Sequence, residues 1–561
     1  MHKISRRLFL KYSAGAMLGY TVQAREGGIS ETDAGRKQMG QSDLYISIDN
    51  EKIERDARRS LLGEGLIFGL SYMWDEKNQC MWPRLMAMLK ELDADFFGHL
   101  GGPGMWVHDY HWKNCIGPME KRRDPTPRLH VFDDVNGKAG THEYGLMLEE
   151  YRNAMGRDAL GSIQVNIMTG TAGDAADWVE YMNGSSHTRW GAIRSENGHR
   201  EPFNVQYWEL GNQPHFTFAN MGRLTGVEYA ERVREFTTAM KERDPTIKVA
   251  AYMPFFAFDS TVAEAIKLGS AIDGIPGKPG SDGPTWTELV LRESGNIIDA
   301  LGFHWYGAAN SRVHSHEYIM SSAYKGLLPN IERARRVVAE FAPSDESRER
   351  LGRFVCPEYG GISGNSPIGE TATAIYGSVA NSRLLHLFFS RDDILYAARF
   401  GLFAPYPEPK MIREMRTAYV AIHGRLDGSD FLGTAAYEMK RLWAKAYQPK
   451  VMSVDIDRCP CFSTGIPVLD ATALGSGDGK ALNLVLTNTS QKALLPKVSL
   501  NGFRSKPIAE RLLVCGDLND DNRWDDRSNV LLQTEEFSVG NEFKIKLPPN
   551  SINAVLMKGD K

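Results

Sequence analysis

The chain has 561 residues, 42% of them hydrophobic and 24% charged, and it carries a formal net charge of −4. This length allows a large buried core shared between a large domain and a smaller one. The nearly balanced charge excludes the strongly basic surface that a nucleic acid or an anionic membrane would require, so neither is expected as a partner.

The first 24 residues have the parts of an export signal in the usual order. Ser5–Lys11 (SRRLFLK) is similar to the twin-arginine signature, a mildly apolar stretch follows over Tyr12–Val22, and VQA at 22–24 offers a cleavage site. The apolar stretch is too short to span a bilayer, and no later segment has the roughly 18 apolar residues of a membrane helix. We therefore expect a signal peptide over residues 1–24, a polar linker over 25–42, and export to the periplasm or the cell exterior.

Beyond residue 60, apolar runs bounded by Gly, Asn or Pro alternate with segments of helical periodicity. Eight runs have the length and composition of strands that are buried on both faces: Gly65–Trp74, Ala94–Gly101, Ser162–Thr169, Val205–Leu210, Lys248–Met253, Ile298–Tyr306, Arg353–Tyr359 and Ile394–Phe400. The amphipathic segments expected as helices between them include Pro83–Leu92, His142–Met155, Ala175–Asn183, Val227–Glu242, Asn330–Ala342 and Thr371–Ser390. Repeated strand–helix units predict an α/β fold whose parallel sheet closes into a (β/α)8 TIM barrel over residues 61–445.

From about Pro449 the pattern changes to short alternating runs separated by turns, among them VMSVDID, LNLVLTN and INAVLMK. This pattern is typical of antiparallel strands and predicts a C-terminal β-sandwich over residues 446–561. One further strand, Leu44–Asp49, precedes the barrel. We expect the segment 43–60 to carry this strand into the sandwich.

Polar residues end three of the predicted barrel strands, where such barrels hold their catalytic groups. Asn212 and Gln213 follow the fourth strand, His304 and Tyr306 close the sixth, and Glu358 closes the seventh. A carboxylate at the end of an apolar strand is costly to bury unless it has partners or a function. A retaining glycosidase uses two carboxyl groups about 5–5.5 Å apart, one as nucleophile and one as acid/base. The predicted site holds one carboxylate and, in Gln213, an amide of the same shape as the second.

Several longer segments resemble glycoside hydrolase family 51 (GH51), the α-L-arabinofuranosidases of clan A. In chain order they are YHWKNCIGP, NIMTGTAGDAADWVEYMNG, NGHREPFNVQYWELGN and LPPNSINAVLM. The resemblance covers nearly everything after residue 43 and implies a role for each candidate residue. Glu358 would be the nucleophile, with Gln213 at the acid/base position. The residues expected to contact the sugar are Asn212, His304, Tyr306, His111 and Trp112.

Other positions depart from the family's pattern. The arginine and asparagine around its Pro-Gly-Gly turn fall on Leu100 and Met105, and its early sugar-binding glutamate falls near Met73. Each hydrogen bond that a buried sugar hydroxyl loses in this way costs roughly 1–3 kcal/mol. We therefore expect a sugar subsite altered from one for arabinofuranose, with Met105 among its substrate contacts.

Gln213 can donate a hydrogen bond but has no proton to transfer. The loss of one general acid/base typically costs about 10²–10⁴ in rate. Four accounts remain open: a deliberate Glu-to-Gln substitution, a leaving group acidic enough to depart unassisted, a neighbouring carboxylate that supplies the proton, and a site that binds sugar without cleaving it. The neighbouring carboxylates would be Asp75, Glu76, Asp109 or Asp259.

These observations predict a retaining glycosidase that acts on side chains of polysaccharides or oligosaccharides, with a non-hydrolytic carbohydrate-binding protein as the alternative. Glu209 is expected to be a structural carboxylate paired with an arginine. The histidine pairs His108/His111 and His314/His316 lack a complete ligand set, so we expect neither a metal nor a cofactor. The six cysteines are too few for a disulfide framework, and we expect mostly buried free thiols. The oligomeric state stays open, a homo-oligomer included.

Overall fold

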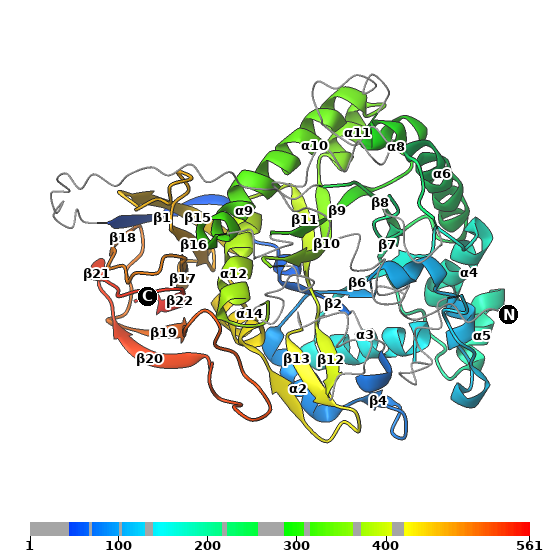
Figure 1. Ribbon diagram of the computed structural model, residues 1–561, viewed down its shortest axis with the longest axis horizontal. Helices are drawn as coiled ribbons and strands as arrows, with labels where there is room; N and C mark the ends of the chain where they lie inside the picture. The colour runs from blue at the N-terminus through cyan, green and yellow to red at the C-terminus, as the bar shows by residue number, and fades with distance from the viewer. Residues whose placement is uncertain are drawn as a thin grey trace, which may run out of the picture.

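Eight parallel strands close into a barrel in the computed structural model, which describes residues 44–66, 70–99, 104–128, 139–215, 222–255, 285–307, 315–362, 372–406 and 420–560. The barrel strands are β2 Gly63–Leu66, β5 Phe96–His99, β6 Leu160–Val165, β7 Tyr207–Leu210, β8 Lys248–Tyr252, β9 Ala300–Tyr306, β10 Phe354–Gly360 and β11 Ile394–Phe400. Each pairs with the next along the chain, and β11 closes the ring against β2. The predicted (β/α)8 barrel is confirmed (Figure 1).

The first barrel strand differs from its prediction. The apolar run Gly65–Trp74 was expected to be one strand, but β2 ends at Leu66. The 3-10 helix η2, Leu70–Tyr72, follows, and then β3, Trp74–Asp75, pairs with β4, Cys80–Met81. The run is apolar because its residues are buried, and burial does not by itself require an extended chain.

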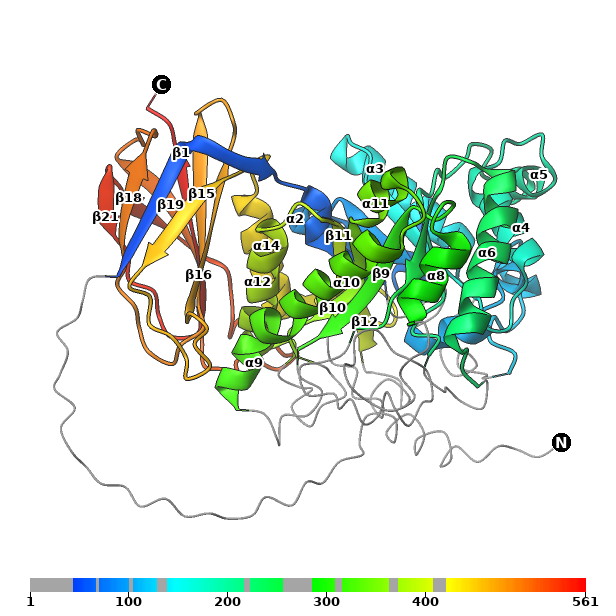
Figure 2. The same ribbon diagram turned by 90° about the horizontal axis from the view of Figure 1, so that it is seen from above.

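Helices surround the barrel on its outer side (Figures 1 and 2). They are α2 Pro83–Leu92, α3 Thr141–Met155, α4 Ala172–Asn183, α5 Arg189–Glu196, α6 Gly226–Arg243, α8 Trp286–Ser294, α9 His316–Ser322, α10 Leu328–Phe341 and α11 Asp345–Leu351. Their starts follow ordinary capping chemistry. In α6, the Thr225 hydroxyl accepts from the Glu228 N–H, and the Glu228 carboxylate accepts from the Thr225 N–H. Nowhere in the described chain does a helix combine the length and the apolar character needed to cross a membrane.

Two helices, α12 (Ile375–Phe389) and α14 (Ala435–Ala446), lie between the barrel and the C-terminal sheet (Figure 2). The sequence predicted an amphipathic helix at α12, but every residue of α12 except Tyr376 is buried. The reason is its position, because α12 packs against the barrel strand β10 and also against strands of the C-terminal sheet. A helix covered on both sides is apolar all round.

The interface between the two parts holds a buried ion pair. Arg383 of α12 places its Nε 2.8 Å from Oδ2 of Asp470, and the two side chains are 1% and 8% exposed. Tyr324 donates a hydrogen bond to the other carboxylate oxygen at 2.7 Å. Breaking such a pair leaves a charge buried without its partner, so the interface favours one fixed arrangement.

The C-terminal region is a nine-stranded sheet that includes β1, Tyr45–Asp56, from the start of the chain. β1 pairs antiparallel with β15 and parallel with β18, whereas the other neighbours in this sheet are antiparallel. The remaining strands are β15 Lys450–Asp457, β16 Leu469–Gly475, β17 Ala481–Asn488, β18 Lys497–Asn501, β19 Ile508–Val514, β20 Gln533–Ser538, β21 Glu542–Lys544 and β22 Ser551–Lys558. The predicted strand-rich region with its own core is confirmed. β20 was missed because its six residues are almost all exposed and show no apolar alternation.

A smaller sheet beside the barrel was also not predicted. It consists of β12 Phe403–Tyr406, β13 Ile422–Arg425 and β14 Phe431–Gly433, with β12 and β13 parallel and β13 and β14 antiparallel. In the chain it follows the last barrel strand and leads into α14, and it lies beside the barrel (Figure 1).

Candidate active site

A tight turn after β7 positions the residues that were predicted to end the fourth barrel strand. Gly211 has a φ of 80°, and a Cβ there would lie 2.5 Å from Ile167 Cγ2, so only glycine fits. Gln213 has a φ of 48°, which is uncommon for a residue with a side chain. Backbone conformations of this kind gather at functional sites, where the surrounding structure holds them in place.

Two buried side chains fix this turn. Tyr229 OH donates a hydrogen bond to Leu210 O at 2.8 Å, and His108 Nε2 donates to Asn212 O at 2.6 Å. Burial lowers the pKa of His108 to about 4, so its ring is neutral at physiological pH. The Asn212 side chain is itself buried, and its Oδ1 has no hydrogen-bond partner among the described residues. A bound hydroxyl group could use this acceptor.

Glu358 lies on β10, in register with His304 on β9, and is 2% exposed. Tyr306 OH donates a hydrogen bond to Glu358 Oε2 at 2.9 Å, and His304 Nδ1 lies 3.4 Å from the same oxygen. Within the described chain, Glu358 Oε1 has no hydrogen-bond partner and no Lys or Arg pairs with the carboxyl group. Burial without a countercharge raises the pKa of Glu358 to about 8, and the Tyr306 hydrogen bond opposes this rise.

Gln213 joins the same cluster through His304. Gln213 Nε2 lies 3.1 Å from His304 Nδ1, and because an amide nitrogen only donates, Nδ1 accepts and the ring proton is assigned to Nε2. Burial lowers the pKa of His304 to about 3, and the neighbouring His215 adds to this effect. The structure thus brings Gln213, His304, Tyr306 and Glu358 into one cluster, from strands that the sequence had singled out.

A second buried carboxyl, Glu209 on β7, lies near this cluster. Its Oε1 accepts hydrogen bonds from Ser162 and Tyr396, both at 2.7 Å. The predicted arginine partner is therefore wrong, because two hydroxyl groups hold this carboxyl instead. Burial raises the pKa of Glu209, and the Glu209 charge in turn raises the pKa of Glu358. The sequence analysis had interpreted Glu209 as a structural carboxylate and had not placed it in the site.

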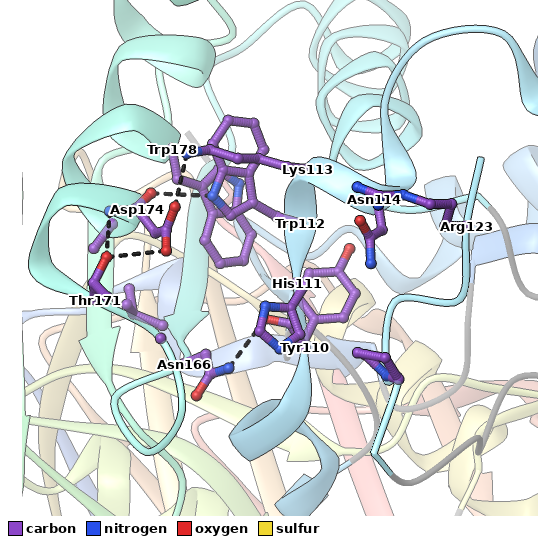
Figure 3. Close-up of a pocket in the computed structure, with 14 residues that line it drawn as sticks. Tyr110, His111, Trp112, Lys113, Asn114, Arg123, Asn166, Thr171, Asp174 and Trp178 are labelled. Atoms are coloured by element: carbon purple, nitrogen blue, oxygen red, sulfur yellow. Dashed lines mark hydrogen bonds and ion pairs between the residues drawn. The ribbon is translucent and has the colours of Figure 1, made fainter. Parts of the chain in front are cut away.

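A pocket of about 290 Å³ opens between the loop that carries His111 and Trp112 and the start of α4 (Figure 3). Asn166, directly after β6, lines it, so the pocket lies beside the end of the strand that neighbours β7. The Trp112 side chain is 3% exposed, and its ring stacks on Trp178 with centroids 5.9 Å apart. His111 is 35% exposed, the more accessible of the two predicted sugar contacts.

The charged groups of this pocket largely satisfy one another. Lys113 Nζ contacts Asp174 Oδ1 at 2.7 Å and Asp177 Oδ2 at 2.6 Å. The other oxygen of Asp174 accepts a hydrogen bond from the Thr171 hydroxyl at 2.9 Å, and the Asp174 carbonyl accepts from Trp112 Nε1 at 3.1 Å. This arrangement stabilises the wall beside α4, while His111 and Arg123 also line the pocket.

Two positions at which the sequence departs from the GH51 pattern fall outside the described part of the chain. They are Leu100 and the side chain of Met105, and the proposed substitute acid Asp259 falls there too. Met73 is described and is 0% exposed, so it belongs to the core around the barrel.

The other proposed substitute acids are engaged elsewhere or exposed. Asp75 accepts hydrogen bonds from the Lys77 and Asn78 backbone N–H groups and from the Asn78 amide, which closes its own turn. Asp109 is 0% exposed and accepts from the Arg128 N–H at 2.7 Å. Glu76 lies on the surface of the same turn as Asp75. Of the described carboxyl groups, Glu209 is the one that acts on Glu358 electrostatically.

The described residues contain no group of three His, Cys, Asp or Glu side chains placed to hold a metal ion. All six cysteines are unpaired, but only Cys115 and Cys356 are buried. The expectation of mostly buried thiols is therefore wrong, and Cys461 in particular is exposed.

A parallel eight-stranded barrel with a buried carboxyl group near the end of its seventh strand offers the frame, and one of the two carboxyl groups, that a retaining glycosidase uses. Comparison with known proteins adds to this observation. A family model described as the alpha-L-arabinofuranosidase 1 domain matches residues 88–274.

Among curated proteins, a probable α-L-arabinofuranosidase C from Aspergillus clavatus is 32% identical over 165 residues, which are 29% of this chain and 31% of that protein. An intracellular exo-α-(1→5)-L-arabinofuranosidase from Streptomyces lividans is 25% identical over 222 residues, which are 40% of this chain and 29% of that protein. The chain thus spans less than a third of the length of these curated relatives.

Solved structures match over nearly the whole chain. An α-L-arabinofuranosidase from Thermotoga maritima, in complex with arabinose, has a TM-score of 0.72 at 23% identity, with 92% of this chain and 100% of that chain covered. The GH51 α-L-arabinofuranosidase from Thermotoga petrophila has a TM-score of 0.70 at 22% identity, with 91% and 99% covered. At this identity the structures establish the fold. The comparisons thus show a chain with the fold of these structures and, over residues 88–274, a similarity to the alpha-L-arabinofuranosidase 1 domain.

Proposed function

We propose that this protein is a retaining glycoside hydrolase of the α-L-arabinofuranosidase kind, with Glu358 as its nucleophile. The observation that carries the proposal is the Glu358 carboxyl group, buried at the end of the seventh barrel strand with one oxygen held by Tyr306 and the other without a partner in the described chain. Such a group is costly to bury, and no described Lys or Arg is paired with it.

In this proposal the ionised Glu358 attacks the anomeric carbon through Oε1 and forms a covalent glycosyl-enzyme, while the bond to the leaving group breaks. Water then hydrolyses the glycosyl-enzyme and releases Glu358. Tyr306 keeps Oε2 fixed, so that the oxygen without a partner is the one that attacks. Asn212 Oδ1 accepts a hydroxyl of the cleaved sugar. The apolar residues Leu100 and Met105, in place of polar groups of the family, favour a sugar other than arabinofuranose.

The leaving group has to depart without a proton from residue 213. The Gln213 amide can orient the glycosidic oxygen or the attacking water, but it neither gives nor accepts a proton. Since Asp75 and Asp109 are engaged in their own contacts, they are poor substitutes. Among side chains of polysaccharides or oligosaccharides, the proposal therefore requires those whose leaving group is acidic or is protonated by the substrate itself.

A second candidate is a carbohydrate-binding protein on the same scaffold, and two observations favour it. Gln213 lacks the proton that cleavage of an ordinary glycoside requires. The raised pKa of Glu358, about 8, leaves the carboxyl group mostly protonated and non-nucleophilic at neutral pH. For either candidate we propose export to the periplasm or the cell exterior, because of the signal-like residues 1–24.

Turnover of dinitrophenyl glycosides separates the two candidates, because this leaving group needs no acid. A panel of pentosides and hexosides is assayed with and without azide, which can replace an activated water. We expect turnover that azide accelerates and that falls by about 10⁴-fold or more in Glu358→Ala. Glu349→Ala, a change of the same kind at an exposed position of α11, should leave the rate unchanged. Sugar binding without turnover of any substrate would refute the hydrolase and leave the binding protein.

A further inference from the structure

Beneath the cluster of catalytic candidates lies a carboxyl group to which the proposed chemistry gives no role. Glu209 is 4% exposed, and its Oε1 accepts hydrogen bonds from the Ser162 and Tyr396 hydroxyls. Its Oε2 has no hydrogen-bond partner in the described part of the molecule. The other titratable groups near it are Cys356 and Tyr144, whose pKa values burial raises, so neither carries a charge. Two hydroxyl donors favour the charged carboxylate but do not neutralise it.

The amide of Gln164 connects Glu209 to Glu358. Gln164 lies on β6, in register with Glu209, and is 1% exposed. It lies close enough to both carboxyl groups to favour their charged forms, although neither amide atom reaches full hydrogen-bond geometry. One amide beside both carboxyl groups makes them neighbours in the barrel interior. In such a dry interior, the charge on one opposes ionisation of the other.

None of the described groups that face Glu358 supplies a positive charge. From β9, Tyr306 donates a hydrogen bond and His304 is neutral. Cys356 of β10 and Tyr252 of β8 have pKa values raised by burial and are uncharged. Across the described ranges, no Lys or Arg is paired with either carboxyl group. Because both carboxyl groups are buried without a cation, the pair retains a proton at neutral pH.

We propose that Glu209 is a positioning residue that controls when the nucleophile becomes charged: it carries the negative charge of the pair and keeps the proton on Glu358 in the resting site. The inference rests on the proposed function, because it takes Glu358 as the nucleophile. Two hydroxyl groups donate to Glu209 and one donates to Glu358, so the first charge settles on Glu209. When the pH rises, the proton passes from Glu358 to solvent and the nucleophile becomes active.

Infrared difference spectroscopy of the full chain tests this inference without turnover, so a failure of the hydrolase proposal does not affect the readout. The spectrum of a protein minus that of its Glu358→Gln counterpart isolates the C=O band of protonated Glu358, which is followed from about pH 5 to about pH 10. In Glu209→Gln the midpoint should fall by about one pH unit or more, because the amide keeps the acceptor for Ser162 and Tyr396 but removes the charge. An unchanged midpoint would overturn the inference.

Two Tyr→Phe variants provide a matched pair, and they keep the test decisive if Glu209→Gln does not fold. Tyr396→Phe removes a donor from Glu209, weakens its hold on the charge and lowers the Glu358 midpoint by a smaller amount. Tyr306→Phe removes the donor of Glu358 itself and raises the midpoint. Opposite shifts support the inference, and shifts of the same sign, or none, overturn it. A merely structural Glu209 would change the melting temperature and leave the midpoint where it is.

Discussion

At the interface between barrel and C-terminal sheet, Asp470 is 8% exposed and its Oδ2 lies 2.8 Å from Arg383 Nε. At the barrel mouth, Glu358 is 2% exposed, and the described groups beside its carboxyl group are a tyrosine hydroxyl, a neutral histidine and the Gln164 amide. Both carboxyl groups are buried, yet within the described residues the one at the interface has a cation and the one at the mouth has none. The desolvation cost is offset at the interface and not at the mouth.

Two further buried carboxyl groups follow the pattern of the interface. Glu143 forms a two-pronged pair with Arg122, with N–O distances of 2.7 and 2.9 Å. Glu64, on the first barrel strand, lies 3.1 Å from Lys440 Nζ, and both side chains are fully buried. In these three places the chain supplies a cation, whereas within the described residues no Lys or Arg is paired with Glu358. Together with its place at the end of a barrel strand, this difference supports a role for Glu358 in chemistry.

The largest effect is expected when a third carboxyl group is added to the barrel mouth, beside Glu358 and Glu209. Gln213→Glu should raise kcat/KM by about 10²–10⁴ for glycosides with poor leaving groups, because the new group can donate a proton. Dinitrophenyl glycosides, which need no acid, serve as the internal control and should change little. Rates are measured across a series of leaving groups of increasing basicity. An equal response of good and poor leaving groups would mean that residue 213 does not lie at the acid/base position.

At the interface the opposite experiment removes a countercharge. Arg383→Met should lower the free energy of unfolding by about 3–5 kcal/mol, because Asp470 keeps only the Tyr324 hydrogen bond. Urea denaturation measures this change. The double variant Arg383→Met/Asp470→Leu should recover the part of the loss that comes from the buried charge, but not the part that comes from the Arg383 hydrogen bonds to the Met320 and Pro467 carbonyl groups. If the double variant is as unstable as the single one, these hydrogen bonds rather than the charge explain the loss.

Much of the fold could be predicted because the signals are local. Helix α2 was predicted to the residue, since Pro83 can begin a helix and the apolar residues that follow recur at helical spacing. Strand ends were equally readable, which is why Gln213, His304 and Glu358 were placed around one mouth. The first strand was overextended because an apolar run signals burial but not backbone conformation.

The relation between Glu209 and Glu358 could not be predicted in this way. The two residues lie on the fourth and seventh strands, and they approach only because the barrel closes. The expectation of an arginine beside Glu209 came from the general cost of a buried charge. Two hydroxyl groups that donate to Glu209 offset this cost, and a proton retained on Glu358 avoids a second buried charge. Closure of the fold, rather than any local motif, determines these contacts.

A neutral side chain in place of Glu358 should stabilise the protein, whereas a neutral side chain in place of Arg383 should destabilise it. The pKa of Glu358 is about 8 in the folded protein against an ordinary value of 4.5, so between these pH values the folded state binds more protons than the unfolded one. The free energy of unfolding therefore falls as the pH rises through this window. Glu358→Gln should remove this fall and be more stable than the wild type by about 2–4 kcal/mol above pH 8. Urea denaturation at several pH values measures it, and parallel pH dependences of the two proteins would contradict it.

The last prediction concerns the pH dependence of catalysis. If Glu358 must be ionised to attack, kcat/KM for a dinitrophenyl glycoside should rise about tenfold per pH unit below the Glu358 pKa and level off above about 8. His304 contributes no step to this rise, because burial lowers its pKa to about 3 and keeps it neutral throughout. The substrate must be one whose own hydrolysis is slow over this range. A rise that is complete near pH 5 would mean that Glu358 is ionised at neutral pH. Glu358 and Asp470 would then differ in the groups that surround them but not in their protonation state.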